Sequence, residues 1–166
     1  VEAMCPVNCK IKWVNDIVYG GLKIAGILTE TVFDAQSGKP KYAVVGIGIN
    51  VNNSKSDIPK ELEDKAVSLK IICGKEICRE KLAASLIKEL DKISDAFPEN
   101  KEYYLSEYRK NCAVIGKKVT LKQQDTELSG TAMGIDGDFG LVLKKDGGEL
   151  FTVTFGDVSV EGFYGH

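Results

Sequence analysis

Two lysines and one aspartate border an apolar hairpin near the start of the chain, and they are the side chains best suited to chemistry. Lys12 and Asp16 precede the predicted turn, and Lys23 follows it. An ammonium group at a strand end meets a phosphate or a carboxylate as a point charge, so these residues predict an anion site. The alternative is that both lysines are solvated residues of edge strands, where they also oppose aggregation.

A second feature is a pair of glycines, Gly46 and Gly48, that stand two residues apart in an apolar run. In a strand this spacing puts both glycines on one face, which is then bare of side chains. A flat ligand fits against such a face. A β-bulge or close packing of the strand on a helix explains the same glycines, and the residues alone leave the two interpretations even.

An antiparallel meander is expected to position these groups. The diglycine Gly20-Gly21 lies between two β-prone runs and supplies the positive φ angles of a tight turn. Alternation in Cys9–Trp13 places Ile11 and Trp13 on one face of a strand, which Trp13 anchors. The predicted segments that follow are the strand Thr29–Phe33, a turn-rich loop at 34–40 and the strand Tyr42–Asn50.

Helices are predicted after the meander. The strongest covers Glu80–Phe97 and ends before Pro98, with apolar residues at steps of three and four. This stripe predicts core positions at Leu82, Leu86, Leu90, Ile93 and Phe97. The other predicted helices are Glu61–Leu69, with a continuation that ends at Gly74, and Tyr103–Cys112.

The last part of the chain has a different character, because short alternating runs are separated by glycine-rich turns. The predicted strands are Lys117–Lys122, Glu127–Gly134, Phe139–Lys145 and Glu149–Phe155. Four short strands in so short a stretch predict a small antiparallel barrel. A boundary is therefore expected between Cys112 and Gly116, which gives one unit at 1–113 and another at 114–166.

Composition narrows the class of protein. The chain has 166 residues, 43% of them hydrophobic and 28% charged, which is typical of a globular protein with a real core. Its net charge is −2 and no basic block exceeds two lysines, so the sequence excludes an electrostatic surface for nucleic acid. It has no apolar run long enough to span a membrane and no secretory signal, so we expect a cytoplasmic protein with no membrane contact.

Cysteine usage agrees with that location. The five cysteines have spacings C-x3-C and C-x4-C, and the one histidine is His166, so the spacing of zinc ligands is not met. An odd set of unpaired cysteines is typical of a reducing compartment.

Three segments together resemble the biotin protein ligases. The run 12–16, Lys-Trp-Val-Asn-Asp, followed by 21–30, Gly-Leu-Lys-Ile-Ala-Gly-Ile-Leu-Thr-Glu, is similar to the central motif pair of that family. The segment 46–52, Gly-Ile-Gly-Ile-Asn-Val-Asn, stands at about the family's distance downstream. Residues 119–160 are similar to its small C-terminal domain.

The resemblance implies an α+β fold. Its first part is a mixed antiparallel sheet with packed helices, like class II aminoacyl-tRNA synthetases and biotin synthetases. A small all-β Src-homology-3-like barrel follows. The resemblance also implies an N-terminally incomplete catalytic domain, because family members begin with a front portion that carries a Gly/Arg-rich loop. The chain's two arginines, Arg79 and Arg109, lie in no such run, and we expect the chain to be inactive alone.

The implied activity joins biotin to ATP as biotinyl-5′-AMP and then transfers biotin to a lysine of a biotin carboxyl carrier domain. The implied catalytic residues are Lys23, Lys12 and Asp16, where Asp16 either orients a lysine or helps to hold Mg²⁺. The biotin and adenylate positions are Lys23, Gly26, Ile27, Leu28, Gly46, Gly48 and Asn50, with Asn50 near adenine. The implied cofactors and substrates are therefore ATP, biotin and Mg.

The chain departs from the family pattern at two places. Val14 replaces the proline of the first motif, and Ser159-Val160-Glu161 replaces a Ser-Leu-Arg run, so that arginine's role does not carry over. The alternative function is a non-catalytic adaptor or a module for dimerisation or carrier docking. An exposed meander edge is also compatible with a homodimer.

Overall fold

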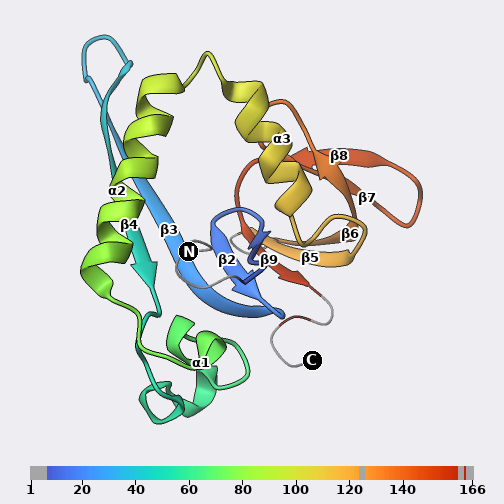
Figure 1. Ribbon diagram of the computed structural model, residues 1–166. Coiled ribbons are helices and arrows are strands. Elements are labelled where there is room, and N and C mark those ends of the chain that lie inside the picture. The colour runs from blue at the N-terminus through green and yellow to red at the C-terminus, as the bar shows by residue number, and fades with distance from the viewer. Residues whose placement is uncertain (1–6, 124–125, 161–162, 164–166) are drawn as a thin grey trace.

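The computed structural model describes residues 7–123, 126–160 and 163 and contains two antiparallel sheets joined by helices (Figure 1). Glu161 and His166, named above, and Cys5, one of the five cysteines, lie outside the described residues. The first sheet has the order β1-β2-β3-β4, with strands Lys10–Lys12, Asp16–Tyr19, Leu22–Phe33 and Pro40–Ile49. The helices are α1 (Leu69–Cys73), α2 (Arg79–Ala96) and α3 (Lys101–Asn111), and short 3-10 turns cover Lys55–Asp57 and Lys60–Leu62.

The predicted meander is confirmed. Gly20 and Gly21 join β2 to β3 with φ angles of 58° and 84°, which a residue with a side chain seldom adopts. The loop between β3 and β4 begins at Asp34, whose Oδ1 accepts hydrogen bonds from the backbone N–H groups of Gln36 and Ser37. The turn-forming residues in the sequence therefore predict these strand ends correctly.

The long helix and the last helix are also confirmed within two residues at each end, but the helix predicted at Glu61–Leu69 is wrong. The chain there forms only a short 3-10 turn and then runs beside β3, where Ala66 forms a parallel bridge to Lys23. The N–H of Val67 donates to the carbonyl of Lys23 at 2.9 Å. Pairing with β3 satisfies backbone groups that a helix would otherwise satisfy internally. Helix α1 starts at Leu69 and ends at Cys73, and Gly74 caps it with a φ of 68°.

The predicted core stripe of α2 is wrong over most of its length. Leu82 is buried and Leu86 is half-buried, but the remaining members, Leu90, Ile93 and Phe97, are exposed. The first half of α2 faces β4, because Leu82 and Leu86 line a depression with Ile47 and Ile49, and the second half continues beyond that depression (Figure 1). Among the described residues no second layer covers that half of the helix, so the stripe is an uncovered apolar surface.

The second sheet has five strands where four were predicted. Its order is β8-β7-β6-β5-β9, and its strands are β5 (Lys118–Gln123), β6 (Thr126–Ile135), β7 (Leu141–Lys144), β8 (Leu150–Val153) and β9 (Asp157–Val160). Strand β9 was missed because only Val158 and Val160 give it an apolar face. It pairs with β5 and forms the edge of the sheet opposite to β8.

One core cluster joins the two sheets. Trp13, in the turn after β1, and Val18 of β2 pack in the same cluster as Leu105 of α3 and the inner face of the second sheet. The prediction that Trp13 anchors a buried face is confirmed, since 2% of it is exposed. The turn after β1 and strand β2 therefore contribute to the core of the second sheet. Burial of this apolar surface stabilises the contact between the two sheets. A smaller cluster around Ile24, Leu69 and Leu82 lies under α1 and the start of α2.

Gly130 of β6 is a site where a methyl group should destabilise the second sheet. A Cβ there would lie 2.8 Å from the carbonyl oxygen of Lys144, a backbone atom of the neighbouring strand that cannot move without disturbing the pairing. We expect Gly130→Ala to lower the free energy of unfolding by about 1 to 3 kcal/mol. Urea unfolding measures the change. Gly137→Ala is the matched control, since a Cβ at Gly137 meets no described atom within 4 Å; equal midpoints for the two variants would contradict the prediction.

The cysteines and the helices complete the description. Cys78 and Cys112 are free, but Cys73 is disulfide-bonded, so the prediction that the cysteines are unpaired is wrong for Cys73. In the described part of the chain, no helix combines the length and the apolar character that crossing a membrane requires.

Candidate functional site

Lys23 and Asp16 form an ion pair at the centre of the first sheet. Lys23 Nζ lies 2.6 Å from Asp16 Oδ1, and the two side chains are 43% and 15% exposed. A β-bulge makes this contact possible. Ile17 of β2 pairs with Ala25, and the next residue, Val18, pairs with Lys23, so Ile24 is an extra residue in β3.

The bulge re-aims Lys23. Without it, Lys23 and Gly26 would lie on opposite faces, because they are three positions apart along the strand. With it, Ile24 and Ala25 are both buried, and Lys23 emerges on the face of Gly26 and Asp16. A Cβ on Gly26 would lie 3.1 Å from the Nζ of Lys23 and 3.3 Å from Asp16 Oδ1. No pattern in the sequence indicates this bulge, although Lys23, Gly26 and Asp16 are all among the predicted site residues.

Lys12 also belongs to the cluster, but it is buried. It sits opposite Asp16 in the β1–β2 ladder and is only 4% exposed. Its Nζ lies 3.9 Å from Asp157 Oδ1 at the start of β9. Burial lowers the pKa of Lys12, and the negative charges of Asp157 and Asp16 partly oppose that shift. The interpretation of Lys12 as a solvated edge lysine is therefore wrong, because the second sheet covers it.

The buried charge of Lys12 predicts a pH dependence of stability. Since its pKa in the folded chain is below 10.5, the unfolded chain holds more protons between that lowered value and 10.5, and stability rises with pH across this window. We expect Lys12→Met to remove this rise and to leave stability at pH 7 equal or higher. Urea unfolding of both proteins from pH 7 to 10.5 measures the difference. Lys10→Met, from the same strand, controls for the lost positive charge. Lys10→Met should keep the wild-type pH dependence of the free energy of unfolding. The prediction fails if Lys12→Met keeps it as well.

Beside the ion pair, three glycines form a bare floor. Gly26 pairs with Gly48, and Leu28 pairs with Gly46, so these four residues share the face that carries Lys23 and Asp16. Added Cβ atoms show how open this floor is: one on Gly48 would meet no described atom within 4 Å, and one on Gly46 only the carbonyl of Leu28 at 3.8 Å. The face interpretation of Gly46 and Gly48 is favoured over a bulge, since their pairing with β3 is regular.

Ile27 differs from its neighbours in this respect. It pairs with Ile47 on the opposite face of the sheet, and Ile47 lines a depression against α2. The side chain of Ile27 therefore cannot line the glycine floor, although its backbone borders it.

Two asparagines complete the surroundings. The side-chain amide of Asn50 donates to the carbonyl of Lys23 at 3.5 Å, and the backbone N–H of Asn50 donates to the carbonyl of Ile24 at 2.8 Å. Asn50 therefore lies beside the bulge. Asn15 was not predicted as a site residue. Its side-chain amide donates to the carbonyl of Ile27 at 2.6 Å, and its carbonyl accepts from the N–H of Ile27 at 3.0 Å. Asn15 thus ties the segment before Asp16 to the edge of the floor.

The contacts of Asp16 bear on the choice between orienting a lysine and holding a metal ion. Its Oδ1 is engaged by Lys23, which favours the first role. Among the described residues, no three His, Cys, Asp or Glu side chains are grouped so as to hold a metal ion.

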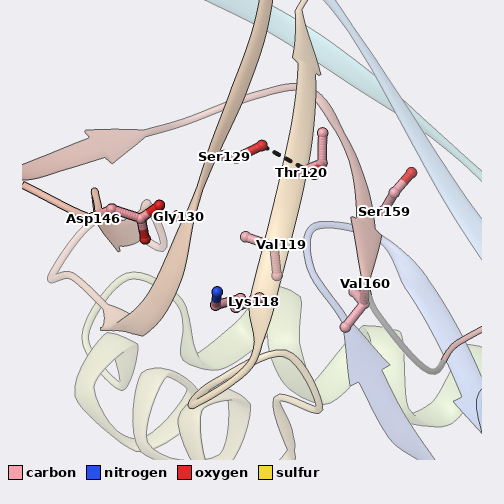
Figure 2. A pocket seen from close by; sticks show the side chains of 8 residues that line it. All are labelled: Lys118, Val119, Thr120, Ser129, Gly130, Asp146, Ser159 and Val160. Atoms are coloured by element: carbon pink, nitrogen blue, oxygen red, sulfur yellow. Dashed lines mark hydrogen bonds between the residues drawn. The ribbon is translucent and has the colours of Figure 1, made fainter.

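A separate depression lies on the second sheet, with a volume of about 410 Å³ (Figure 2). Thr120 and Ser129 are directly opposite each other across β5 and β6, and their hydroxyl oxygens are 3.1 Å apart. Figure 2 shows Lys118 and Asp146 at other parts of its rim. None of the predicted site residues lines it, and its hydroxyl and charged groups are those of a solvated sheet surface.

Comparison with known proteins bears directly on this site. Residues 5–50 match the sequence model of the biotin/lipoate A/B protein ligase family, and residues 114–160 match that of the biotin protein ligase C-terminal domain. The first match contains Lys12, Asp16, Lys23 and all three floor glycines.

Individual relatives agree. The chain is 31% identical over 153 residues to the bifunctional ligase/repressor BirA of Bacillus spizizenii, covering 89% of this chain and 45% of that protein. It is 29% identical over 157 residues to the biotin–acetyl-CoA-carboxylase ligase of Mycobacterium tuberculosis, covering 94% and 54%. The chain thus spans about half the length of these relatives.

A solved structure shows the same arrangement of elements. The biotin protein ligase from Aquifex aeolicus in complex with biotin and ATP superposes with a TM-score of 0.79 at 26% identity, covering 96% of this chain and 65% of that one. Both family matches, these relatives and this structure agree with the motifs read from the sequence, and the chain belongs to the biotin protein ligase family.

Proposed function

We propose that this chain carries the lysine-and-glycine part of the active site of an enzyme that joins biotin to ATP and transfers it to a carrier protein. The observation that carries the proposal is the bulge in β3, which sets the Lys23 ammonium, paired with Asp16, at the edge of a floor bare of side chains. That geometry suits a flat ring with an acidic tail. The ring lies over Gly46 and Gly48, and the tail ends at Lys23, whose ammonium lies over Gly26.

The chemistry requires fixed positive charge at that point. In the first step a biotin carboxylate oxygen attacks the α-phosphorus of ATP, and pyrophosphate leaves as biotinyl-5′-AMP forms. Two anions approach each other, so Lys23, with Lys12 behind it, offsets their repulsion and stabilises the charge of the transition state. Asp16 keeps the Lys23 side chain in place. Asn50, beside the bulge, offers an adenine edge both a donor and an acceptor.

In the second step the neutral amine of a carrier lysine attacks the acyl carbon. AMP leaves, and the amine proton passes to solvent. The carrier is a biotin carboxyl carrier domain of a biotin-dependent carboxylase. We infer that Mg²⁺ enters with ATP and is held chiefly by its phosphates, since Mg²⁺ in such sites commonly takes only one or two protein carboxylates. ATP and biotin are supported by the Aquifex aeolicus ligase, whose structure contains both.

Several finer features belong to the same proposal. Residues 1–113 would form a catalytic domain of the class II synthetase type, and residues 114–166 a Src-homology-3-like barrel; the family match that starts at residue 114 supports this division. Use of ATP and a carboxylase carrier places the enzyme in the cytoplasm. The free edge of β4 offers a strand for pairing in a homodimer.

A second candidate is a non-catalytic docking module. It is favoured by the exposed apolar residues next to the floor, among them Leu28 and Val44, on the face that Lys23 shares. Such a surface fits a protein partner as well as a ligand. The two candidates differ in whether adenylate forms.

The deciding experiment uses the full-length gene product with ATP, Mg²⁺ and labelled biotin. Chromatography should detect biotinyl-adenylate, and label should then appear on a purified biotin carboxyl carrier domain but not on the same domain with its acceptor lysine changed to arginine. Absence of both products rejects the ligase proposal. Binding of the carrier domain without adenylate formation would favour the docking module.

A further inference from the structure

Two residues of the turn between β1 and β2, Trp13 and Val14, are hydrogen-bonded to the second half of the chain. Trp13, directly after Lys12, donates its indole N–H to the carbonyl oxygen of Phe139 at 2.9 Å. Phe139 lies in the turn between β6 and β7, and its φ of 64° is the one positive value of a non-glycine residue in the described part of the chain. A backbone conformation of this kind is costly for phenylalanine and persists only where its surroundings enforce it.

The turn itself is held rigidly. Asp136 Oδ1 accepts hydrogen bonds from the backbone N–H groups of Asp138 at 2.8 Å and Gly140 at 2.7 Å. Gly140 leaves no room for a side chain, because a Cβ would lie 2.6 Å from Thr152 Cγ2. Phe139 is therefore fixed between two anchored neighbours, and its carbonyl has a set direction.

Helix α3 binds the same turn and the same motif. The ring of Tyr108 packs edge-on against that of Phe139, with centroids 5.5 Å apart. Its hydroxyl donates to the carbonyl oxygen of Val14 at 2.9 Å, and burial raises its pKa, so the hydroxyl keeps its proton. The neighbouring Arg109 donates from Nε to the carbonyl of Ile135 at 2.8 Å, at the end of β6.

We propose that Tyr108 and Phe139 are positioning residues for the reaction, which hold the segment Trp13–Val14 and thereby fix Lys12 on one side of it and Asp16 on the other. The inference rests on the proposed function. Lys12 and Asp16 lie directly opposite each other in the β1–β2 ladder, and the two held residues belong to the turn that joins those strands. Rotation of this turn would move Lys12 and the carboxylate that holds Lys23 together.

The second sheet therefore also positions the motif residues of the first sheet. Catalytic groups must be held within a fraction of an ångström of their productive positions, and the neighbouring hydrogen bonds and packing do this. Because Tyr108 and Phe139 contact the motif through its backbone and the Trp13 indole, they act on the transition state through Lys12 and Asp16. Their loss should therefore lower kcat for adenylate formation and leave KM for biotin and ATP little changed.

The test is Tyr108→Phe in the full-length gene product, which removes the hydroxyl and keeps the ring against Phe139. We expect kcat for adenylate formation to fall roughly three- to tenfold, the effect of one lost hydrogen bond on a barrier. Tyr103→Phe is the matched control, because Tyr103 lies on the same helix with its side chain exposed. Phe139→Gly is a second variant: glycine accepts the positive φ, so the carbonyl stays in place while the ring is lost, and we expect kcat to fall as it does for Tyr108→Phe.

A readout independent of activity comes from fluorescence. Trp13 is the chain's one tryptophan, and we expect its emission to shift in Tyr108→Phe and not in Tyr103→Phe when both are measured in the 166-residue chain. Identical kcat, KM and emission for the two tyrosine variants would overturn the proposal, and so would a rise in KM with kcat unchanged. A wild-type protein that makes no adenylate overturns the proposed function instead, and the emission of Trp13 then decides the coupling by itself.

Discussion

Replacing Lys23 by alanine should nearly abolish formation of biotinyl-adenylate while leaving the fold intact. The Lys23 ammonium lies at the edge of the glycine floor, 2.6 Å from Asp16, where the carboxylate and the α-phosphate would meet. Loss of a fixed charge aimed at developing negative charge costs about 2 to 4 kcal/mol of barrier, which is roughly 30- to 1000-fold in rate. The side chain is nearly half exposed, so its ion pair contributes less than about 1 kcal/mol to stability. Single-turnover adenylation and thermal unfolding of the full-length gene product measure the two effects.

Two further variants sharpen that result. Lys23→Arg keeps the charge but replaces a point ammonium by a planar fork, so it should recover only part of the rate. Lys41→Ala removes an exposed lysine from β4 of the same sheet and should change neither rate nor stability. Near-normal adenylation by Lys23→Ala, with an unchanged melting temperature, would show that Lys23 is only a surface partner of Asp16.

Local signals in the sequence were sufficient for most of the elements. The diglycine at Gly20-Gly21 and the turn at Asp34 stop strands through φ angles and side-chain hydrogen bonds that involve neighbouring residues only. The period of α2 and the proline after Phe97 likewise define that helix locally. The spacing of Gly46 and Gly48 left a bare face and a bulge as equal alternatives, and only the regular pairing of β3 with β4 favours the face.

The predictions that were wrong concern residues whose structure depends on contacts between distant segments. The helix expected at Glu61–Leu69 was lost to pairing of Ala66 with β3, a partner that no local pattern reveals. The alternative that Lys12 is a solvated edge lysine failed because Lys12 is buried, with Asp157 of β9, more than a hundred residues later, 3.9 Å from its Nζ. The bulge that brings Lys23 to the face of Asp16 also follows from sheet register rather than from residue type. The resemblance to the family motifs names these residues without giving the geometry that unites them.

The surface around the candidate site is open in the described part of the chain. On the face that holds Lys23, the floor glycines are followed along β3 and β4 by apolar residues that are largely exposed, and Leu28 is 62% exposed. The uncovered stripe of α2 lies on the other side of the same sheet. An ammonium group open to water interacts with an anion far more weakly than one in a site from which water is excluded.

The 166-residue chain by itself should therefore form biotinyl-adenylate at least about a thousandfold more slowly than a complete biotin protein ligase. Lys23 and the floor supply one side of a binding site, and a ligand held on one side only keeps much of its freedom and its hydration. Purified chain, ATP, Mg²⁺ and labelled biotin, followed by chromatography, measure the rate, with the Aquifex aeolicus ligase as the positive control. The exposed apolar faces should also make the chain self-associate, which sedimentation at several concentrations detects. Turnover close to that of the control would mean that the residues described here already enclose the reacting groups, and the open glycine face would then not be where biotin binds.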